Sequence, residues 1–165
     1  MGLKLNLGCG LDKREGYVNI DIREDVEPDM VIDLEKELLQ RFEDESVDEI
    51  LAKDFLEHLS WRVVETFLRD CHRVLKHNGR IYIQTPDLEA IAKKVILNPN
   101  FKFGSLYGFK AVSYWVYGGQ EYPENTHKSG FTMNSLKRLL EDIGFEVLEL
   151  KNDGGTNIVC WARKL

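Results

Sequence analysis

Two glycines and an aspartate near the N-terminus have the residue types and the spacing of a nucleoside-binding site. Gly8 and Gly10 follow a short apolar strand predicted over residues 3–7, and a ligand can approach their backbone where a Cβ would collide. Asp21 lies at the end of the next predicted strand, over residues 17–22. In an α/β sheet, an acid in that position is placed to accept both hydroxyls of a ribose. The three residues therefore predict a cofactor that contains a nucleoside.

The loop between these two strands limits which nucleotide can bind. A dinucleotide site needs a long helix straight after its glycines, to place a helix N-terminus on the pyrophosphate. Only residues 11–16 are available here, which is too short for that helix. A phosphate-binding P-loop would need a Gly-Lys-Ser/Thr sequence, and none follows Gly10. A diphosphate ligand is therefore disfavoured, and a nucleotide-sugar or dinucleotide enzyme stays only as an alternative.

Two histidines are candidates for acid–base chemistry. His58 follows the end of a predicted strand, where a contact to cofactor or substrate and a structural hydrogen bond agree equally well with the sequence. His127 lies between Asn125 and Lys128, after a Gly-Gly pair. If residues 104–131 fold over the edge of the sheet, His127 could deprotonate a hydroxyl. The alternative is a packed subdomain in which His127 is a hydrogen-bonded polar residue.

Metal binding and thiol chemistry are not expected from the remaining histidines and cysteines. His72 and His77 lie near the end of a predicted helix and are interpreted as surface residues, with no Cys or carboxylate to complete a metal spacing. Cys9 is interpreted as a small filler between glycines, and Cys71 as a core residue. Together with Cys160 they are far apart and odd in number, which favours reduced thiols in the cytoplasm.

The alternation of strands and helices predicts an α/β fold that brings the candidate residues to one edge. Further strands are expected over residues 30–32, 47–52, 80–85, 145–150 and 157–162. Helices are expected over about 34–41 after Asp33, from the N-cap Ser60 to Asn78-Gly79, from Asp87 to Asn98-Pro99, and from Thr132 to Gly144. This order predicts a doubly wound, mostly parallel sheet with helices on both faces and an antiparallel C-terminal strand pair. In such sheets ligands bind beyond the carboxyl ends of the strands, where the candidate residues lie.

Length, charge and composition indicate one globular domain. The 165 residues are expected to form a single domain, with an aromatic-rich insertion at about 100–131 as a lid or substrate-binding region. The net charge of −6 argues against extended binding to nucleic acid. No apolar run reaches the length of a membrane span and no signal peptide is recognised, so we expect a cytoplasmic protein without membrane contact. Aromatic residues over 101–122 line either a pocket or a homodimer surface.

Five short motifs occur in an order that is typical of one enzyme superfamily. They are Leu5-Asn6-Leu7-Gly8-Cys9-Gly10, Asn19-Ile20-Asp21, Ser46-Val47-Asp48-Glu49-Ile50, Phe55-Leu56-Glu57-His58-Leu59 and Arg73-Val74-Leu75-Lys76-His77-Asn78-Gly79-Arg80. Together they resemble the class I S-adenosylmethionine-dependent methyltransferases, in the group of small methyltransferase domains. The resemblance covers about residues 3–90 and extends weakly to the C-terminus. Each motif alone has low specificity for this superfamily, whereas the ordered set is fairly specific.

The resemblance implies a cofactor site and a role for each residue in it. The turn at Gly8-Cys9-Gly10 would lie under the methionine part of S-adenosylmethionine, and Asp21 would bind the ribose hydroxyls. Asp33 and Leu34 would lie near the adenine, and Asp54 to Leu56 would contact the methionine side. The cofactor-binding residues implied in this way are Asn6, Gly8, Cys9, Gly10, Asp21, Ile22, Asp33, Leu34, Asp54, Phe55 and Leu56.

The activity that the resemblance implies is methyl transfer to an oxygen or nitrogen nucleophile of a small-molecule or glycan acceptor, with S-adenosylhomocysteine as product. The sequence departs from the family pattern at two points, because Asn6 stands where an acid is usual and the first helix is missing. These departures keep open a non-catalytic cofactor-binding or regulatory module of the same fold. His127 and His58 are the candidate catalytic residues, and no metal is expected.

Overall fold

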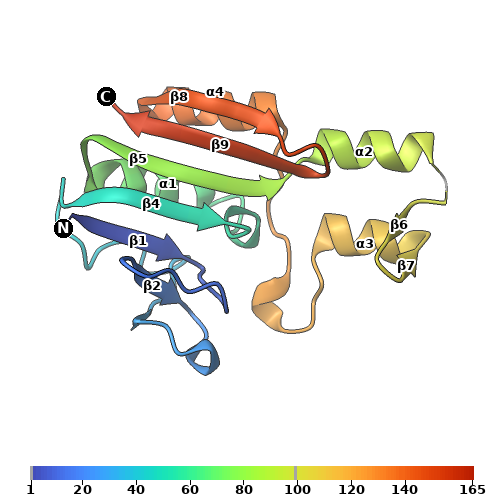
Figure 1. Cartoon of the computed structure of the whole chain (residues 1–165), viewed down its shortest axis with the longest axis horizontal. Helices are drawn as coiled ribbons and strands as arrows, with labels where there is room; N and C mark the ends of the chain where they lie inside the picture. Colours follow the sequence, from blue (N-terminus) through green and yellow to red (C-terminus); the bar gives the residue numbers. More distant parts are fainter. Residues whose placement is uncertain (1, 99) are drawn as a thin grey trace.

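A seven-stranded, mostly parallel sheet forms the centre of the molecule (Figure 1). The computed structural model describes residues 2–98 and 100–165. The strands of this sheet are β1 (Leu3–Leu7), β2 (Val18–Asp21), β3 (Met30–Val31), β4 (Val47–Lys53), β5 (Leu75–Pro86), β8 (Phe145–Asn152) and β9 (Asn157–Lys164). Their order is β3-β2-β1-β4-β5-β9-β8, and β9 is antiparallel to both of its neighbours. The expected α/β fold with an antiparallel C-terminal strand pair is confirmed.

The strand order reverses at β1, and this reversal places a ligand crevice at the carboxyl ends of β1 and β4. The chain moves outward from β1 to β2 and β3, and then returns to β4 on the other side of β1. In open α/β sheets such a switch point leaves a crevice, because the connections from the two central strands lead away from each other. Gly8 follows the end of β1, Asp21 lies at the end of β2, and Asp54 follows the end of β4.

Four helices accompany the sheet in the described chain, and two of them, α2 and α4, carry capping residues that the sequence predicts. They are α1 (Val64–Val74), α2 (Leu88–Leu97), α3 (Phe109–Tyr117) and α4 (Met133–Ile143), with short 3-10 turns at η1 (Glu24–Val26), η2 (Leu56–His58) and η3 (Pro123–Asn125). The Asp87 carboxylate accepts hydrogen bonds from the first turn of α2. Thr132 forms a capping box with Ser135 at α4, and Gly144 ends that helix with a φ of 115°.

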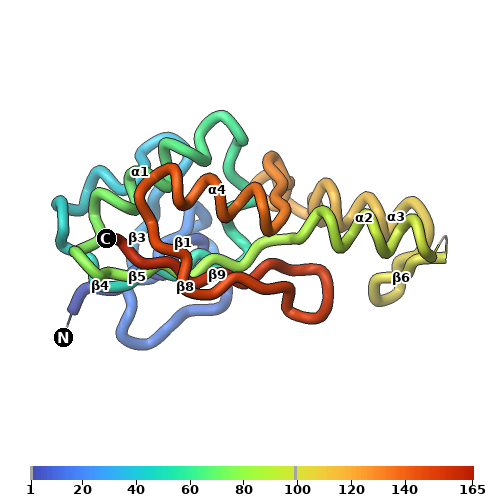
Figure 2. The backbone as a smooth tube through the Cα atoms, turned by 90° about the horizontal axis from the view of Figure 1, so that it is seen from above, coloured from blue at the N-terminus to red at the C-terminus, as the bar shows by residue number. Residues whose placement is uncertain are grey.

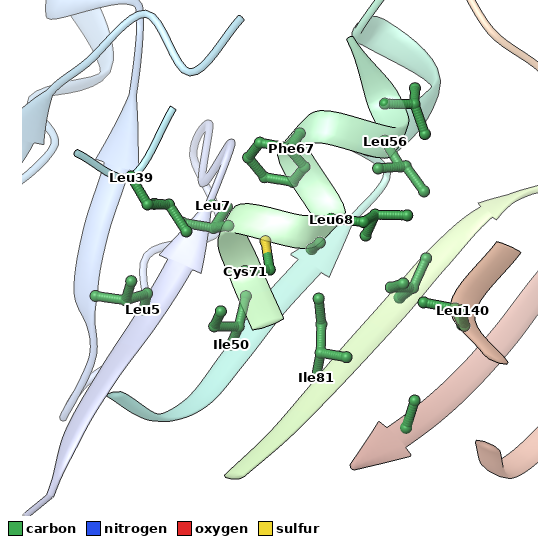
Figure 3. Close-up of a cluster of buried hydrophobic side chains, with 14 of the residues drawn as sticks. Leu5, Leu7, Leu39, Ile50, Leu56, Phe67, Leu68, Cys71, Ile81 and Leu140 are labelled. Atoms are coloured by element: carbon green, nitrogen blue, oxygen red, sulfur yellow. The ribbon is translucent and has the colours of Figure 1, made fainter. Parts of the chain in front are cut away.

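The hydrophobic core lies between one face of the sheet and the helices α1 and α4 (Figure 3). Alternate residues of each strand point into it, as the two-residue period of a strand requires. Phe67, Leu68 and Cys71 of α1 are fully buried against these strand residues. The buried strand residues of the cluster include Leu5, Leu7, Ile50, Ala52, Ile81, Ile83, Ile158, Cys160 and Ala162. The apolar stripe at three- and four-residue spacing thus predicts the buried side of α1 correctly.

The opposite face of the sheet carries no helix in the part of the chain that the structure describes, which corrects the expectation of helices on both faces. Figure 2 shows α1 and α4 on one side of the strands and a blue N-terminal loop on the other, while α2 and α3 extend beyond the sheet. Leu51, Tyr82 and Trp161 lie in register across this open face. The connections that could supply a second layer are too short, since residues 8–17 and 22–29 form only loops and one 3-10 turn.

Two predictions about helices are wrong, and a contact with a distant part of the chain accounts for the first. Residues 34–41 form successive turns instead of a helix, and the Leu39 N–H donates instead to the Asp70 carboxylate of α1 at 2.7 Å. Helix α1 ends at Val74 rather than at Asn78-Gly79. Asn78 does have a left-handed φ of 65°, but it lies in an irregular stretch of β5, where the register to β4 shifts.

Two further helix ends differ from the prediction by a few residues. α1 begins at Val64, and Ser60 lies in the turn before it, where its carbonyl oxygen accepts a hydrogen bond from the Val64 N–H. α2 ends at Leu97 with Asn98 as its C-cap, and the predicted stop at Pro99 lies outside the described residues. No helix within residues 2–98 and 100–165 is both long and apolar enough to cross a membrane.

The insertion over residues 100–131 extends from the carboxyl edge of the sheet (Figure 1). It contains α3 and a two-stranded ribbon of β6 (Lys102–Phe103) and β7 (Leu106–Tyr107). The Phe103 ring packs on Tyr114 and Trp115, with ring centroids 5.0 and 4.8 Å apart. Part of the aromatic cluster therefore forms a small packed unit of its own.

Candidate active site

A cavity of about 470 Å³ opens at the carboxyl ends of β1, β2 and β4. Most of the residues expected to bind the cofactor line it, namely Gly8, Gly10, Asp21, Ile22, Asp33, Leu34, Asp54 and Phe55. Asn6, Cys9 and Leu56 are not among the lining residues. The edge of the sheet thus collects residues from separate strand ends into one site, as the parallel topology requires.

The glycine turn after β1 is held in place by Asp21 and Phe55. Gly8 and Gly10 have φ values of 61° and 49°, in the left-handed region that glycine adopts without strain. A Cβ added to Gly8 would overlap the Phe55 ring. The Gly10 N–H donates a hydrogen bond to Asp21 Oδ2 at 2.8 Å. The turn therefore needs both glycines for its shape, and it presents their backbone to the cavity.

Asp21 combines a structural role with free hydrogen-bonding capacity. It is buried, with 8% of its surface exposed, and it lines the cavity. One carboxylate oxygen accepts from the Gly10 N–H, and the other accepts from the Arg23 N–H at 2.9 Å. A carboxylate offers about four lone-pair positions, so roughly two remain for further donors. The two hydroxyls of a ribose are donors of the right kind and number.

An apolar wall lies next to Asp21. Ile22, Ile32 and Leu34 line this part of the cavity, and the Ile32 N–H donates to the Asp21 carbonyl oxygen at 3.0 Å. The Asp33 carboxylate pairs with the Lys36 ammonium at 2.8 Å. A flat and mostly apolar base such as adenine can bury its faces against side chains of this kind.

The end of β4 is fixed against β5 and α1. Asp54 has a φ of 50°, and its N–H donates to the Gln84 carbonyl oxygen at 2.9 Å. Its carboxylate accepts from Gln84 Nε2 at 3.0 and 3.2 Å. Phe55 packs edge-on against Phe67, with ring centroids 5.6 Å apart. A non-glycine residue with a left-handed backbone, held at the wall of a cavity, is typical of functional sites.

The insertion supplies the outer wall of the cavity through Tyr122, Pro123, Glu124 and Lys128. The Arg23 guanidinium lies 4.2 Å from the centre of the Tyr122 ring, and the Lys128 ammonium pairs with Glu35 at 2.7 Å. These wall residues were not identified from the sequence, because a segment without periodicity gives no signal of where it folds. A Gly-Gly pair before them was the one local hint that the chain turns here.

Asn6 holds the loop that follows the glycine turn. Its side-chain amide donates to the Asp12 carbonyl oxygen at 2.9 Å and to Asn19 Oδ1 at 3.0 Å. Asn19 Oδ1 also accepts from the Arg14 N–H at 2.7 Å. Residues 11–16 form turns and loop, in agreement with the prediction that they are too short for a helix. Side-chain amides therefore fix a segment that has no helical hydrogen bonds of its own.

His58 and His127 meet beside the cavity, although they lie far apart in the sequence. Their ring centroids are 5.1 Å apart, and His58 is a lining residue. His58 Nδ1 lies 3.3 Å from the Thr126 carbonyl oxygen, and His127 Nδ1 lies 3.1 Å from that of Trp115. Burial lowers the pKa of both imidazoles, and His58 lowers the pKa of His127 further. Both rings are therefore neutral near neutral pH, with the proton on Nδ1 and a lone pair on Nε2.

A buried carboxyl group lies beside the two histidines. Glu57 is 3% exposed, and its Oε2 accepts a hydrogen bond from the Thr85 hydroxyl at 2.9 Å. Burial raises the pKa of Glu57 to about 8. Metal-ligating atoms of Glu57, His58 and His127 all lie within 4.8 Å of one another. Glu57 was not identified from the sequence, where its only signal was its position next to His58.

The cysteines and His72 have structural surroundings. Cys9 is 4% exposed, and burial raises its pKa to about 11, which agrees with its interpretation as a filler. Cys71 and Cys160 are buried free thiols, and burial raises the pKa of each. His72 is not a surface residue as expected, because it is half-buried and packs edge-on against Phe145 with centroids 5.0 Å apart.

Comparison with known proteins shows what the sequence and the fold of this chain are similar to. Residues 5–83 match a family model described as a methyltransferase domain. The fold is similar to that of a SAM-dependent methyltransferase from Archaeoglobus fulgidus, with 18% identity, a TM-score of 0.64, and coverage of 99% of this chain and 86% of that one. A SAM-dependent methyltransferase from Methanosarcina mazei has 20% identity, a TM-score of 0.64, and coverage of 99% and 92%. The 1,6-didemethyltoxoflavin-N1-methyltransferase of Burkholderia thailandensis, with bound 1,6-didemethyltoxoflavin and S-adenosylhomocysteine, has 16% identity, a TM-score of 0.62, and coverage of 98% and 70%. No curated protein matches the sequence.

The match to the methyltransferase domain lies in the first half of the chain, and the solved structures, each at most 20% identical to it, share its fold. The matched residues include the glycine turn, Asp21 and the end of β4. They therefore contain most of the residues that line the cavity. His127 and the outer wall belong to the insertion, beyond the matched region.

Proposed function

We propose that this protein is a class I S-adenosylmethionine-dependent methyltransferase, and that it transfers a methyl group to a hydroxyl of a small-molecule or glycan acceptor bound beside His58 and His127. The observation that carries the proposal is the pair of neutral imidazoles at the edge of the cofactor cavity. Each ring has its Nδ1 on a carbonyl oxygen and a free lone pair on Nε2. A hydroxyl is the nucleophile that needs such an acceptor, because its proton must leave as its oxygen attacks.

The residues of the cavity fit S-adenosylmethionine. The Phe55 ring occupies the position that a Cβ on Gly8 would take, and Gly8 and Gly10 line the cavity. Asp21 keeps free lone pairs for two ribose hydroxyls. Ile22 and Leu34 offer the apolar surface that an adenine needs. S-adenosylmethionine has no phosphate, which suits a site with no P-loop sequence.

The cofactor supplies a methyl group on a sulfonium that is already reactive, so the protein mainly contributes proximity and alignment. The acceptor oxygen forms a bond to the methyl carbon as the carbon–sulfur bond breaks. The electron pair of that bond stays on sulfur, and the product S-adenosylhomocysteine is neutral at sulfur. The proton of the hydroxyl leaves at the histidine pair, where two Nε2 lone pairs are available.

The insertion and the charge of the chain support a compact acceptor. Tyr122 and Glu124 narrow the outer wall of the cavity. The backbone N–H of His127 donates a hydrogen bond to the carbonyl oxygen of Tyr117 at 3.0 Å, and the side chain of Tyr117 is 57% exposed. An exposed aromatic side chain on a residue whose backbone bonds to His127 suits a sugar ring or a small aromatic molecule. The net charge of −6 disfavours an extended nucleic acid, and three free thiols accord with the cytoplasm.

Turnover with a panel of sugars and hydroxylated aromatic compounds tests the acceptor class. We expect methyl ethers as products, detected by mass spectrometry together with S-adenosylhomocysteine. His58→Ala should lower kcat by roughly 100-fold or more, the usual contribution of a positioned proton acceptor, while leaving affinity for S-adenosylhomocysteine nearly unchanged. His77→Ala is the matched control, because His77 is exposed and lies away from the cavity. Methylation of amines alone would show that the hydroxyl assignment is wrong.

A non-catalytic cofactor-binding module is the second candidate, and the missing first helix favours it. Residues 11–16 offer no helix N-terminus to the methionine carboxylate, which would normally gain from the helix dipole. This candidate predicts binding of S-adenosylmethionine without transfer to any acceptor. Cofactor binding followed by turnover on at least one hydroxyl acceptor would reject it.

A further inference from the structure

Three metal-ligating side chains from two distant segments converge beside the cofactor cavity. Glu57 and His58 belong to η2, and His127 belongs to the insertion. One possible ligand atom from each lies within 4.8 Å of the others. We propose that these three residues hold one divalent transition-metal ion, which binds the oxygen of the methyl acceptor. The inference rests on the proposed function for the role of the ion, and the site itself can be tested alone.

The hydrogen bonds of the two imidazoles prepare them as ligands. Each ring has its Nδ1 close to a backbone carbonyl oxygen, that of Thr126 for His58 and that of Trp115 for His127. A metal-bound histidine almost always donates its other ring N–H to such a partner, which fixes the tautomer and the orientation of the ring. Nε2 of both rings is therefore the atom that is free to bind a cation.

Glu57 is a buried acid without a cation beside it. It is 3% exposed, and no ion pair to it is found among the residues that the structure describes. The Thr85 hydroxyl occupies Oε2 only. Burying a carboxylate without a compensating charge is costly, so the group is held as a neutral acid or neutralised by a bound cation. A metal ion between Glu57 and the two imidazoles supplies that compensation.

The backbone around the three side chains is cross-linked, as a preformed site requires. The N–H groups of Lys128 and Ser129 both donate to the Glu57 carbonyl oxygen, at 2.8 and 3.1 Å. The Ser129 hydroxyl donates to the Leu56 carbonyl oxygen at 3.1 Å. A Cβ on Gly118 would collide with the Asn125 carbonyl oxygen, so residues 118 and 125–127 can lie this close together only with glycine at position 118. Two segments are thus fixed to each other at the position of the ligands.

The ligand set and its location indicate what the ion would do. Two histidines and one carboxylate leave further coordination positions open, as in sites that bind a substrate oxygen. His58 also lines the cofactor cavity, so an open position can face the acceptor. With both Nε2 atoms bound to the ion, the histidines no longer accept the proton. A hydroxyl bound to the ion instead loses its proton to water, and its oxygen then attacks the methyl carbon as the carbon–sulfur bond breaks. The class of acceptor is therefore an alcohol or phenol that can bind a metal through oxygen.

Cobalt binding to tag-free, chelator-treated protein tests the site directly. Co²⁺ is titrated into the wild-type protein and followed by visible absorption and by metal content after gel filtration. We expect one equivalent per chain and d–d bands that saturate. His58→Ala, His127→Ala and Glu57→Gln should each weaken binding by at least about 10- to 100-fold, since even outer partners of ligands contribute that much. His77→Ala, which removes an exposed histidine, should bind like the wild type.

The same preparations separate the metal site from the proposed function. Circular dichroism and thermal unfolding confirm that each variant is folded. If His127→Ala does not fold, His127→Gln replaces it in the binding experiment. Absence of saturable Co²⁺ binding, or unchanged binding in both histidine variants, overturns the metal site even if S-adenosylhomocysteine binds. If the wild type binds one equivalent of Co²⁺ and the variants do not, the metal site is supported. This holds even if calorimetry detects no binding of S-adenosylhomocysteine and the proposed function fails.

Discussion

At the scale of single residues, the glycine turn shows how the absence of one Cβ sets the shape of the cavity. Gly8 lies against Phe55, and Phe55 packs on Phe67 in the core. A side chain at Gly8 would therefore disturb the cofactor turn and the core together. Gly16 lies in the same loop, with no atom near the position of an added Cβ, and it offers a matched comparison.

Gly8→Ala should destabilise the protein more than Gly16→Ala. Both glycines have a left-handed φ, 61° and 81°, so each alanine costs about 1–2 kcal/mol in backbone strain. Only at Gly8 does the new Cβ overlap a neighbour, which adds roughly 1–3 kcal/mol. Urea unfolding of the two variants measures the difference. Equal losses would contradict the packing of the turn against Phe55.

His72 should make the stability of the protein depend on pH. Burial, and then the nearby Lys164 ammonium, lowers its pKa in the folded state. The unfolded chain therefore binds a proton at a higher pH than the folded chain does, and protonation favours unfolding. Stability is complete above the unfolded pKa of about 6.5 and falls as the pH drops through the folded value.

We expect His72→Gln to show a smaller loss of unfolding free energy than the wild type between about pH 7 and pH 5. Urea unfolding at several pH values in this range measures both slopes. His77→Gln is the control, because His77 is exposed and its replacement should leave the slope unchanged. Identical slopes for His72→Gln and the wild type would show that folding does not change the pKa of the half-buried His72 ring.

At the scale of elements, the insertion serves as a wall of the cavity. Tyr122 packs under the Arg23 guanidinium and lines the site, whereas Tyr107 of the same insertion is 70% exposed and does not line it. Tyr122 therefore borders the cavity and Tyr107 does not. Replacing Tyr122 should change the affinity for a ligand in the cavity, and replacing Tyr107 should not.

Tyr122→Ala should raise the Kd for S-adenosylhomocysteine by roughly 2- to 10-fold, because an exposed cation–π contact contributes about 0.5–1 kcal/mol and the wall loses apolar surface. Tyr107→Ala should leave the Kd unchanged. Isothermal calorimetry measures both values. If the two variants bind with equal affinity, the insertion does not form part of the cofactor site.

The elements also show which predictions the sequence can support. The caps at Asp87, Thr132 and Gly144 were predicted correctly, because each is a signal carried by the residues at the helix end itself. Residues 34–41 were not, because Leu39 bonds to Asp70 on α1 and that contact replaces a helical hydrogen bond. Local chemistry predicts helix ends well until a distant partner competes for the same backbone group.

At the scale of the whole molecule, the core is one-sided. Phe67 is fully buried between α1 and the sheet, while Trp161 on the opposite face is half-buried against Tyr82. Phe67→Ala should cost about 3–5 kcal/mol of unfolding free energy, and Trp161→Ala only about 1–2 kcal/mol. Urea unfolding compares them. A larger loss for Trp161→Ala would indicate that the open face is covered in solution.

The meeting of Gly8, Asp21 and Asp54 at one edge could be predicted from the sequence, and the meeting of His127 with Glu57 could not, for a reason of topology. Gly8, Asp21 and Asp54 follow parallel strands, and the carboxyl ends of such strands meet at one edge. The meeting of His127 with Glu57 depends on how a segment without periodicity folds back from α3. Nothing in the sequence near His127 specifies that path.

The measurement that tests the account most directly is calorimetry of S-adenosylhomocysteine binding to the wild-type protein, Asp21→Ala and His77→Ala. We predict binding in the micromolar range for the wild type and His77→Ala. Asp21→Ala should lose affinity by about 100-fold or more, since it removes two hydrogen bonds to a charged acceptor, worth about 1.5–3 kcal/mol each, and frees the Gly10 N–H. No binding by the wild type at millimolar ligand, or equal affinity in Asp21→Ala, would contradict the assignment of this cavity.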